Sequence, residues 1–341
     1  MLRDQRHPVA NSRREFLIML AGAPLALAGG CGVLHPSRAP VISSRPTITN
    51  YSENGNFVLM EGKTSLMALS FPADMSDLTG YLPVNTQPES ARSGKLTEPQ
   101  PLFFYTSRNA GTARAILTAP LDVVEGVYTA SIAGRQEQAD LHWNIKYFIR
   151  YGNYHEATLA VDKSFTEPTP ELVARMRHDF ETTKKVVQRR THRAWDASFT
   201  PPVSGPDRNN FGDKRTYNEM KHSRHAGLDY KAEMGTPVSA INDGVVAFSD
   251  EQLVPGQTIW IDHGGGVFSR YMHLSQRNVR EADVVRRGDI IGLSGNSGGQ
   301  KPLPHLHLDL VVNGTHVDPK DFMRTASHLL WLEAQDRESY G

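Results

Sequence analysis

The stretch Pro304-His305-Leu306-His307, which continues to Val312 as Leu-Asp-Leu-Val-Val, is typical of a β-strand with two histidines near its start. Side chains two residues apart on a strand share a face and lie about 6.6 Å from each other. His305 and His307 therefore share one face, and Leu306 points toward the core. Pro304 suits the start of a strand, since it costs no internal ladder bond. One imidazole can bind a metal while its neighbour stands beside it.

Two more short motifs contain histidine: His225-Ala-Gly-Leu-Asp229 and Tyr271-Met-His273. Each is weak evidence alone, because a histidine and an aspartate four residues apart occur often by chance. Zinc takes about four ligands at roughly 2.0 to 2.2 Å, and a fully extended stretch of this length, about 13 Å, cannot close on one ion. We expect Gly227 to permit a bend that brings His225 and Asp229 together.

The residues around these motifs predict an all-β domain over residues 198–323. Turn signals are separated by short apolar or alternating runs, which is typical of β-hairpins. The turn signals are 242–244, 264–266 and 313–314, and the runs are 258–262, 267–274 and 306–312. We expect residues 324–341 to be a C-terminal tail with a short helix and a frayed end.

Residues 202–322 resemble the lysostaphin-type, or LytM-type, zinc endopeptidases of bacterial cell walls. The resemblance depends on many short matched stretches, whose joint occurrence by chance is very improbable. They are 210–212, 225–229, 235–238, 243–245, 262–264, 271–274, 285–289, 292–295 and 304–307. The resemblance implies Zn²⁺ as the cofactor and the stem or cross-link peptides of peptidoglycan as the substrate.

The resemblance also implies a role for each residue of the three motifs. His225, Asp229 and His307 correspond to the metal ligands, with water as the fourth. His273 and His305 correspond to the two catalytic histidines that do not bind the metal. One would orient or deprotonate the zinc-bound water, and the other would stabilise the oxyanion or protonate the leaving amine. The sequence leaves open which histidine does which.

The resemblance leaves the cleaved bond open. Family members often have Thr-Gly-Arg or a similar triplet before the Pro-His-Leu-His motif, whereas residues 297–303 contain no arginine. This departure puts the substrate preference in doubt, but not the metal. The candidate bonds are D-alanine to diaminopimelate, a glycine bridge, and a terminal D-alanine released in a carboxypeptidase reaction.

Two other functions compete with an enzyme. Relatives that have lost zinc ligands act as non-enzymatic regulators, which activate other wall hydrolases. A wall-binding module, whose cleft only holds peptide, is the second alternative. All five site positions are filled in this chain, which favours a zinc metalloendopeptidase.

The N-terminal half carries no catalytic motif. Short strand-like runs about ten residues apart predict an immunoglobulin-like β-sandwich over residues 46–166. Residues 167–197 then predict a linking α-helix, with Thr169 as N-cap, Pro170 at the first helical position and Glu171 in the first turn.

Residues 1–31 resemble an export signal. Arg13 and Arg14 precede an apolar run, as in twin-arginine signals, although an ordinary Sec signal is the alternative. Cys31 follows a stretch that resembles a lipoprotein processing site; simple cleavage after Ala28 is the alternative. With residues 32–45 as a tether, we expect an exported protein of the periplasm or cell envelope, held to the membrane only through a lipid on Cys31.

The composition excludes other classes of protein. The 341 residues contain 37 Lys and Arg and 37 Asp and Glu, so no net charge would attract nucleic acid. No apolar stretch reaches the roughly 20 residues that a membrane-spanning helix needs. The single cysteine rules out an intramolecular disulfide and a cysteine-based zinc cluster.

Overall fold

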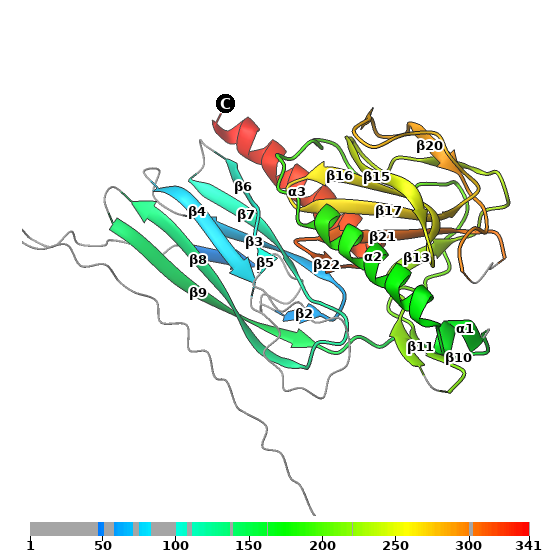
Figure 1. Cartoon of the computed structure of the whole chain (residues 1–341). Coiled ribbons are helices and arrows are strands. Elements are labelled where there is room, and N and C mark those ends of the chain that lie inside the picture. The colour runs from blue at the N-terminus through cyan, green and yellow to red at the C-terminus, as the bar shows by residue number, and fades with distance from the viewer. Residues whose placement is uncertain are drawn as a thin grey trace, which may run out of the picture. The chain divides into compact units, whose positions relative to one another are not determined.

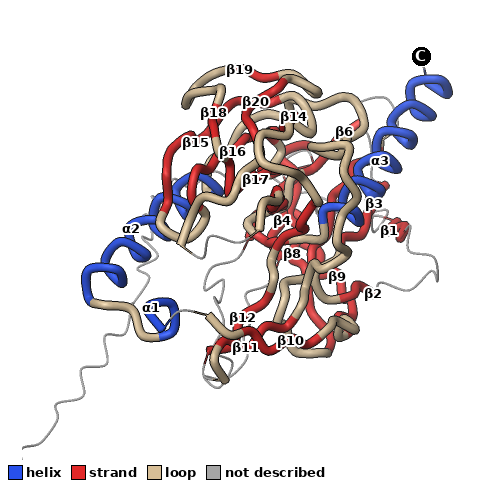
Figure 2. The backbone as a smooth tube through the Cα atoms, turned by 90° about the vertical axis from the view of Figure 1, so that its right-hand side faces the viewer, coloured by secondary structure: helices blue, strands red, loops and turns tan. Residues whose placement is uncertain are grey.

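The computed structural model describes residues 47–50, 58–70, 75–82, 100–107, 111–136, 139–161, 163–219, 221–299 and 303–340. These residues form mostly β-strands, as the sequence predicts (Figures 1 and 2). The expected export signal, the tether and Cys31 lie outside the described residues. Within these ranges, every helix is too short or too polar to cross a membrane.

The described part of the N-terminal half folds into two sheets that share an apolar core. One sheet has the strand order β1-β3-β7-β6 and the other β2-β9-β8-β4-β5. Met67 and Leu117 from the first sheet and Ile145 and Tyr147 from the second are buried together. The strands are β1 Thr47–Asn50, β2 Val58–Met60, β3 Thr64–Ser70, β4 Met75–Leu82, β5 Gln100–Pro101, β6 Phe104–Ser107, β7 Thr112–Thr118, β8 Gly126–Gln136 and β9 Ala139–Arg150.

The linking helix is present as α2, Pro170–Val187, after the short helix α1, Lys163–Thr166. It is shorter than the predicted range, because residues 189–197 are not helical. Its start agrees with the sequence analysis: the Thr169 side chain accepts a bond from the Leu172 N–H at 3.4 Å, and Pro170 and Glu171 lie in the first turn. At its far end Val186 is buried in a small cluster with Trp260 and Phe268. The helix is thereby attached to the C-terminal sheet.

A short sheet joins distant parts of the chain. Strand β10, Glu156–Leu159, falls inside the range predicted for the sandwich, but it pairs in parallel with β11, Lys214–Tyr217. Strand β11 also pairs with β12, Lys221–Arg224, to form a hairpin. Residues 156–159 therefore brace a hairpin that lies just before the His225 motif.

The C-terminal half contains the sheet that positions the candidate site. Its strand order is β13-β21-β17-β16-β15-β19, with β22 beside β21, and a smaller sheet has the order β14-β20-β18. Every residue of the central strand β21 is buried. The strands are β13 Gly227–Tyr230, β14 Pro237–Ser239, β15 Gly244–Gln252, β16 Gly256–Gly264, β17 Val267–Leu274, β18 Gln276–Arg277, β19 Val284–Val285, β20 Ile290–Leu293, β21 Leu306–Val312 and β22 Thr315–His316.

The C-terminal tail differs from the expected short helix. Helix α3 spans 22 residues, Pro319–Tyr340, so the predicted domain end at residue 323 falls inside it. Phe322, Ala326 and Leu329 are buried in a core cluster that includes Leu66 and Ile116. Their spacing of three and four residues puts them on one helical stripe. The helix is long because this stripe packs against β3 and the C-terminal sheet.

His263 shows how a histidine can serve the fold alone. It is fully buried in β16, where Nδ1 donates to the Asp243 carbonyl at 2.7 Å and Nε2 bonds to the Ser269 hydroxyl at 2.8 Å. Burial lowers the pKa of His263 to about 4. The neutral ring therefore connects β16 to β17 and to the turn before β15.

The buried His263 predicts a loss of stability in mild acid. Below pH 6.5 the unfolded chain binds a proton that the folded chain does not bind until about pH 4, so the free energy of unfolding falls across this window. Between pH 7 and pH 5 this loss is roughly 2 kcal/mol. Urea unfolding of His263→Gln should show a shallower pH dependence than the parent protein. The exposed His142→Gln is the control, and an equal change in both variants would contradict the assignment.

Candidate metal centre

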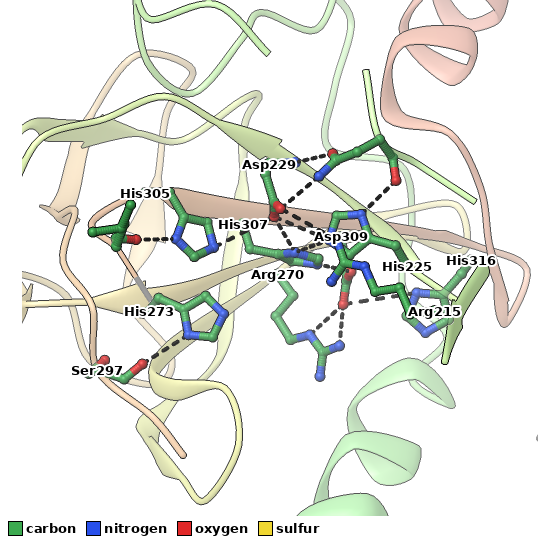
Figure 3. A network of polar contacts seen from close by, with 12 residues as sticks. Arg215, His225, Asp229, Arg270, His273, Ser297, His305, His307, Asp309 and His316 are labelled. Carbon is green, nitrogen blue, oxygen red and sulfur yellow. Dashed lines mark hydrogen bonds and ion pairs between the residues drawn. The ribbon is translucent and has the colours of Figure 1, made fainter. Parts of the chain in front are cut away.

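The strand register brings the His225, Tyr271 and His305 motifs together. Strand β21 lies between β13 and β17, where His307 pairs with Asp229 on one side and with Met272 on the other. His225 Nε2 lies 3.2 Å from Asp229 Oδ1 and 3.0 Å from His307 Nδ1, and His307 Nδ1 lies 2.8 Å from Asp229 Oδ1. Figure 3 shows the three side chains converging on one point. All three are buried.

The three groups present the atoms that a metal ion needs. His225 Nδ1–H donates to the Asn210 carbonyl at 2.8 Å, which leaves Nε2 free to bind a metal. His307 Nε2–H donates to Asp309 Oδ1 at 2.7 Å, which leaves Nδ1 free. A zinc tetrahedron with bonds of about 2.0 to 2.1 Å has edges of about 3.3 Å, close to the observed separations. The donor set fits Zn²⁺ with one position open.

His273 and His305 lie beside the three donors. Their ring centroids are 4.9 Å apart, and His305 Nε2 is 3.7 Å from Asp229 Oδ1. His273 Nδ1–H donates to the Ser297 carbonyl at 2.9 Å, and His305 Nδ1–H donates to the Leu303 carbonyl at 2.8 Å. Since a carbonyl only accepts, each ring carries its proton on Nδ1 when neutral, and Nε2 is the free acceptor. Burial lowers the pKa of His273 to about 4.

The sequence profile of the family described as Peptidase family M23 matches residues 223–319, which contain all five of these residues. The chain contains an M23 peptidase domain. Its metal is zinc, as predicted, because M23 peptidases are zinc enzymes and the donors of the M23 domain fit that ion.

Several named proteins are similar to the M23 domain. The peptidoglycan DD-endopeptidase ShyC of Vibrio cholerae is 38% identical over 96 residues, which are 28% of this chain and 22% of the relative. The DD-carboxypeptidase/endopeptidase Mpg of Neisseria meningitidis is 41% identical over 95 residues, or 28% of this chain and 22% of Mpg. Lysostaphin of Staphylococcus simulans is 38% identical over 110 residues, or 30% and 22%. The chain thus spans about a fifth of each of these relatives.

One solved structure is similar over most of the chain. A putative peptidase M23 from Pseudomonas aeruginosa superposes with a TM-score of 0.56, covering 78% of this chain and 95% of that chain at 19% identity. Such coverage extends beyond the M23 domain. At this identity the similarity establishes a shared fold.

Asn210 organises two of the donors, a role that the sequence did not reveal. Its Nδ2 donates to Asp229 Oδ2 at 2.8 Å, and its Oδ1 accepts from the Asp229 N–H at 3.1 Å. Its own carbonyl holds His225 Nδ1. In the sequence analysis Asn210 belongs to a matched stretch without any role. The only signal was that match, since these partners lie 15 and 19 residues away.

A buried ion pair lies behind His307. Asp309 accepts from Arg270 Nε at 2.7 Å, and the guanidinium lies over the Trp260 ring at 4.8 Å from its centroid. Burial alone would raise the pKa of the Asp309 carboxyl, but Arg270 and His307 hold it well below its usual range. Burial likewise disfavours a charged His307, yet Asp309 and Asp229 raise its pKa to about 9. The surrounding anionic charge favours a cation, and a metal can take the place of the proton.

Gly227 has a different role from the expected bend. It lies inside strand β13 and is absent from the described residues with positive φ. A Cβ at this position would lie 2.2 Å from His307 Nε2 and 2.4 Å from Asp309 Oδ1. The glycine is needed because the His307–Asp309 pair passes directly against the backbone. His225 and Asp229 meet because His225 precedes the strand and Asp229 pairs with His307.

One charged residue near the site was not predicted. Arg215 of β11 extends toward Asp229, with NH2 3.8 Å from Oδ2, on the side of the donors opposite His273 and His305 (Figure 3). Nothing in its sequence neighbourhood marks it, because the hairpin that carries it becomes visible only in the fold. The candidate metal centre therefore has two imidazoles on one side of the donors and a guanidinium from β11, outside the matched M23 residues, on the other.

Gly227→Ala should weaken zinc binding. The added methyl would displace His307 or break its bond to Asp309, so we expect the zinc dissociation constant to rise on the order of 10 to 100-fold, as for other losses of a group that orients a ligand. Chelator competition measures the constant. Gly126→Ala is the matched control, since it lies in strand β8 with no atom within 4 Å of the new Cβ. Unchanged zinc affinity in Gly227→Ala would contradict the role of close approach.

Proposed function

We propose that the protein hydrolyses peptide bonds of bacterial peptidoglycan as a zinc endopeptidase. The convergence of His225, Asp229 and His307 in an M23 domain, with an open metal position beside two further imidazoles, carries the proposal. The relative ShyC, named a peptidoglycan DD-endopeptidase, and the relative Mpg, named a DD-carboxypeptidase/endopeptidase, support a peptidoglycan substrate. A ligand set of three protein groups is typical of catalytic zinc, whereas structural zinc takes four.

The two flanking histidines supply the proton transfers. Zinc held by His225, Asp229 and His307 would supply a Lewis acid for the scissile carbonyl and would lower the pKa of a bound water to about 7. The free Nε2 atoms of His273 and His305 face the site, one to accept a proton from the attacking water and one to return a proton to the leaving amine. The acyl carbon gains the water oxygen as its C–N bond breaks. Both protons of the water end on the leaving nitrogen, so the products are a carboxylate and an ammonium group, and both imidazoles end neutral.

A non-enzymatic regulator is less well supported. Such a protein needs neither the donors nor the two imidazoles, whereas all five are present and oriented by hydrogen bonds in this chain. Muropeptide analysis of purified wall, before and after incubation with the zinc-loaded protein, separates the functions. Release of new amines requires turnover by this protein itself.

Alanine variants should separate metal ligands from catalytic histidines. Removal of His225, Asp229 or His307 should abolish stoichiometric zinc and lower the melting temperature, since zinc at 100 times its dissociation constant adds about 2.7 kcal/mol to stability. Removal of His273 or His305 should leave one zinc per chain but slow hydrolysis on the order of 100 to 10,000-fold. Metal analysis, melting curves and amine release would show it. A zinc-free His273→Ala or a fully loaded His307→Ala would overturn the assignment.

We also propose that the protein is exported and lipid-anchored. Arg13-Arg14 before an apolar run supports twin-arginine export, and Cys31 after the small residues Ala28, Gly29 and Gly30 supports acylation. Residues 32–45 would then tether the folded part to the membrane surface. An exported location agrees with a peptidoglycan substrate.

Two substitutions test the location. Changing Arg13 and Arg14 together to lysine should retain the precursor in the cytoplasm, and Cys31→Ser should move the mature protein from the membrane fraction to the soluble fraction. Fractionation with immunoblotting measures both. Arg45, which lies outside the signal, serves as the control for the arginine changes. Continued export would indicate the Sec route, and unchanged partitioning of Cys31→Ser would exclude the lipid.

A further inference from the structure

Arg215 is a cation held at the candidate metal centre by a braced hairpin. Strand β11 pairs with β10 on one side and with β12 on the other. The end of β12 is tied down by Arg224, which contacts the buried Glu61 at 2.8 Å and Asp122 at 3.4 Å. The Arg215 side chain is 23% exposed, so it borders the site while remaining accessible to a ligand. Its backbone position is therefore well defined.

Holding Asp229 in place does not explain Arg215. Its NH2 lies 3.8 Å from Asp229 Oδ2, which is too long for a hydrogen bond, and Asn210 already donates to that oxygen at 2.8 Å. A guanidinium beside a metal-binding carboxylate also repels the metal, so it costs metal affinity. The position of the Arg215 guanidinium therefore needs an explanation other than metal binding or the support of Asp229.

Arg215 is the cation with free donors at this site. The Arg270 guanidinium donates hydrogen bonds to Asp309. The structure shows no hydrogen bond from the Arg215 guanidinium to any described residue. The described part of the loop that follows β20, residues 296–299, contains no cation, and Lys301 lies outside the described residues. A planar guanidinium with free N–H groups is suited to a carboxylate, which it binds in a bidentate manner.

We infer that Arg215 binds the free α-carboxylate of the substrate residue whose amine leaves. This inference rests on the proposed peptidase function. The Arg215 guanidinium lies 3.8 Å from Asp229, which is a candidate metal donor. Successive Cα atoms of a peptide are about 3.8 Å apart, so a carboxylate that binds Arg215 belongs to the residue at the cleaved bond. His273 and His305 lie on the opposite side (Figure 3), where they meet the leaving nitrogen while its Cα substituent extends toward Arg215.

The inference narrows the substrate class. A bond to a terminal D-alanine, or to the D-centre of diaminopimelate in a cross-link, has a free carboxylate on the carbon next to the leaving nitrogen. An amide inside a glycine bridge has none. Arg215 therefore selects the first class, and the site cleaves bonds to carboxylate-bearing residues in preference to interior glycine bonds.

The test pairs one substitution in the protein with one in the substrate. The substrates are a cross-linked muropeptide dimer with the free α-carboxylate and the same dimer with that carboxylate amidated. With the free dimer, Arg215→Gln should lower kcat/KM on the order of 10 to 100-fold, mainly through KM, as expected for a lost bond between charged groups. With the amidated dimer, parent and variant should be equally slow. Arg215→Lys should recover part of the loss, and the exposed Arg286→Gln is the matched control.

Binding gives a readout that does not need turnover. Zinc-loaded His305→Ala, with and without Arg215→Gln, is titrated with both dimers by calorimetry. Tighter binding of the free dimer only where Arg215 is present supports the inference. An equal effect of Arg215→Gln on both dimers, or a loss of zinc from the variant, would overturn it and indicate a structural role. Cleavage of neither dimer by the parent protein, with charge-selective binding intact, would instead contradict the proposed function.

Discussion

The pairing of Asp229 with His307 across β13 and β21 is the constraint on which the rest of the site depends. A shift of one residue would turn both side chains to the other face of the sheet. The register holds because β21 is buried throughout and its partner strand passes closely at Gly227. His225 reaches the same point from the short loop 225–226, which directly precedes β13. In the flanking strand β17, His273 directly follows Met272, which pairs with His307, so His273 lies beside the donors.

The sequence singled out the five residues that converge in the fold, but it did not reveal their surroundings, for physical reasons. The three candidate metal donors and the two flanking histidines occur in short motifs, where local spacing and family resemblance are informative. The predicted length of helix α3 was too short because its apolar stripe of Phe322, Ala326 and Leu329 is buried only through tertiary packing against β3. Asn210, Arg270 and Arg215 act through partners that are adjacent only in the fold. The sequence predicted that Gly227 permits a backbone bend. In the structure, the close approach of His307 instead excludes any larger side chain at this position.

Around the candidate metal position, acidic and basic side chains alternate in a chain of contacts that runs from Asp229 through His307 and Asp309 to Arg270. Asp229 and Asp309 attract a cation, and Arg270 neutralises the outer carboxylate without contacting the donors. Buried charges are costly unless paired, so each member of this chain stabilises the next one. Arg215 makes only a longer ion pair with Asp229, at 3.8 Å, and its side chain is partly exposed. The buried candidate donors are thus distinct from the partly exposed Arg215.

The contact of Arg224 with Glu61 and Asp122 has a consequence for modularity. Those two carboxylates belong to the N-terminal half, yet they anchor the hairpin that forms one wall of the metal centre. An M23 unit excised from this chain, or grafted onto another carrier, would keep its donors but lose the counter-charges of a nearly buried guanidinium. The two halves are therefore not interchangeable. Recombination between related genes would have to exchange Glu61 and Asp122 together with the hairpin that carries Arg224.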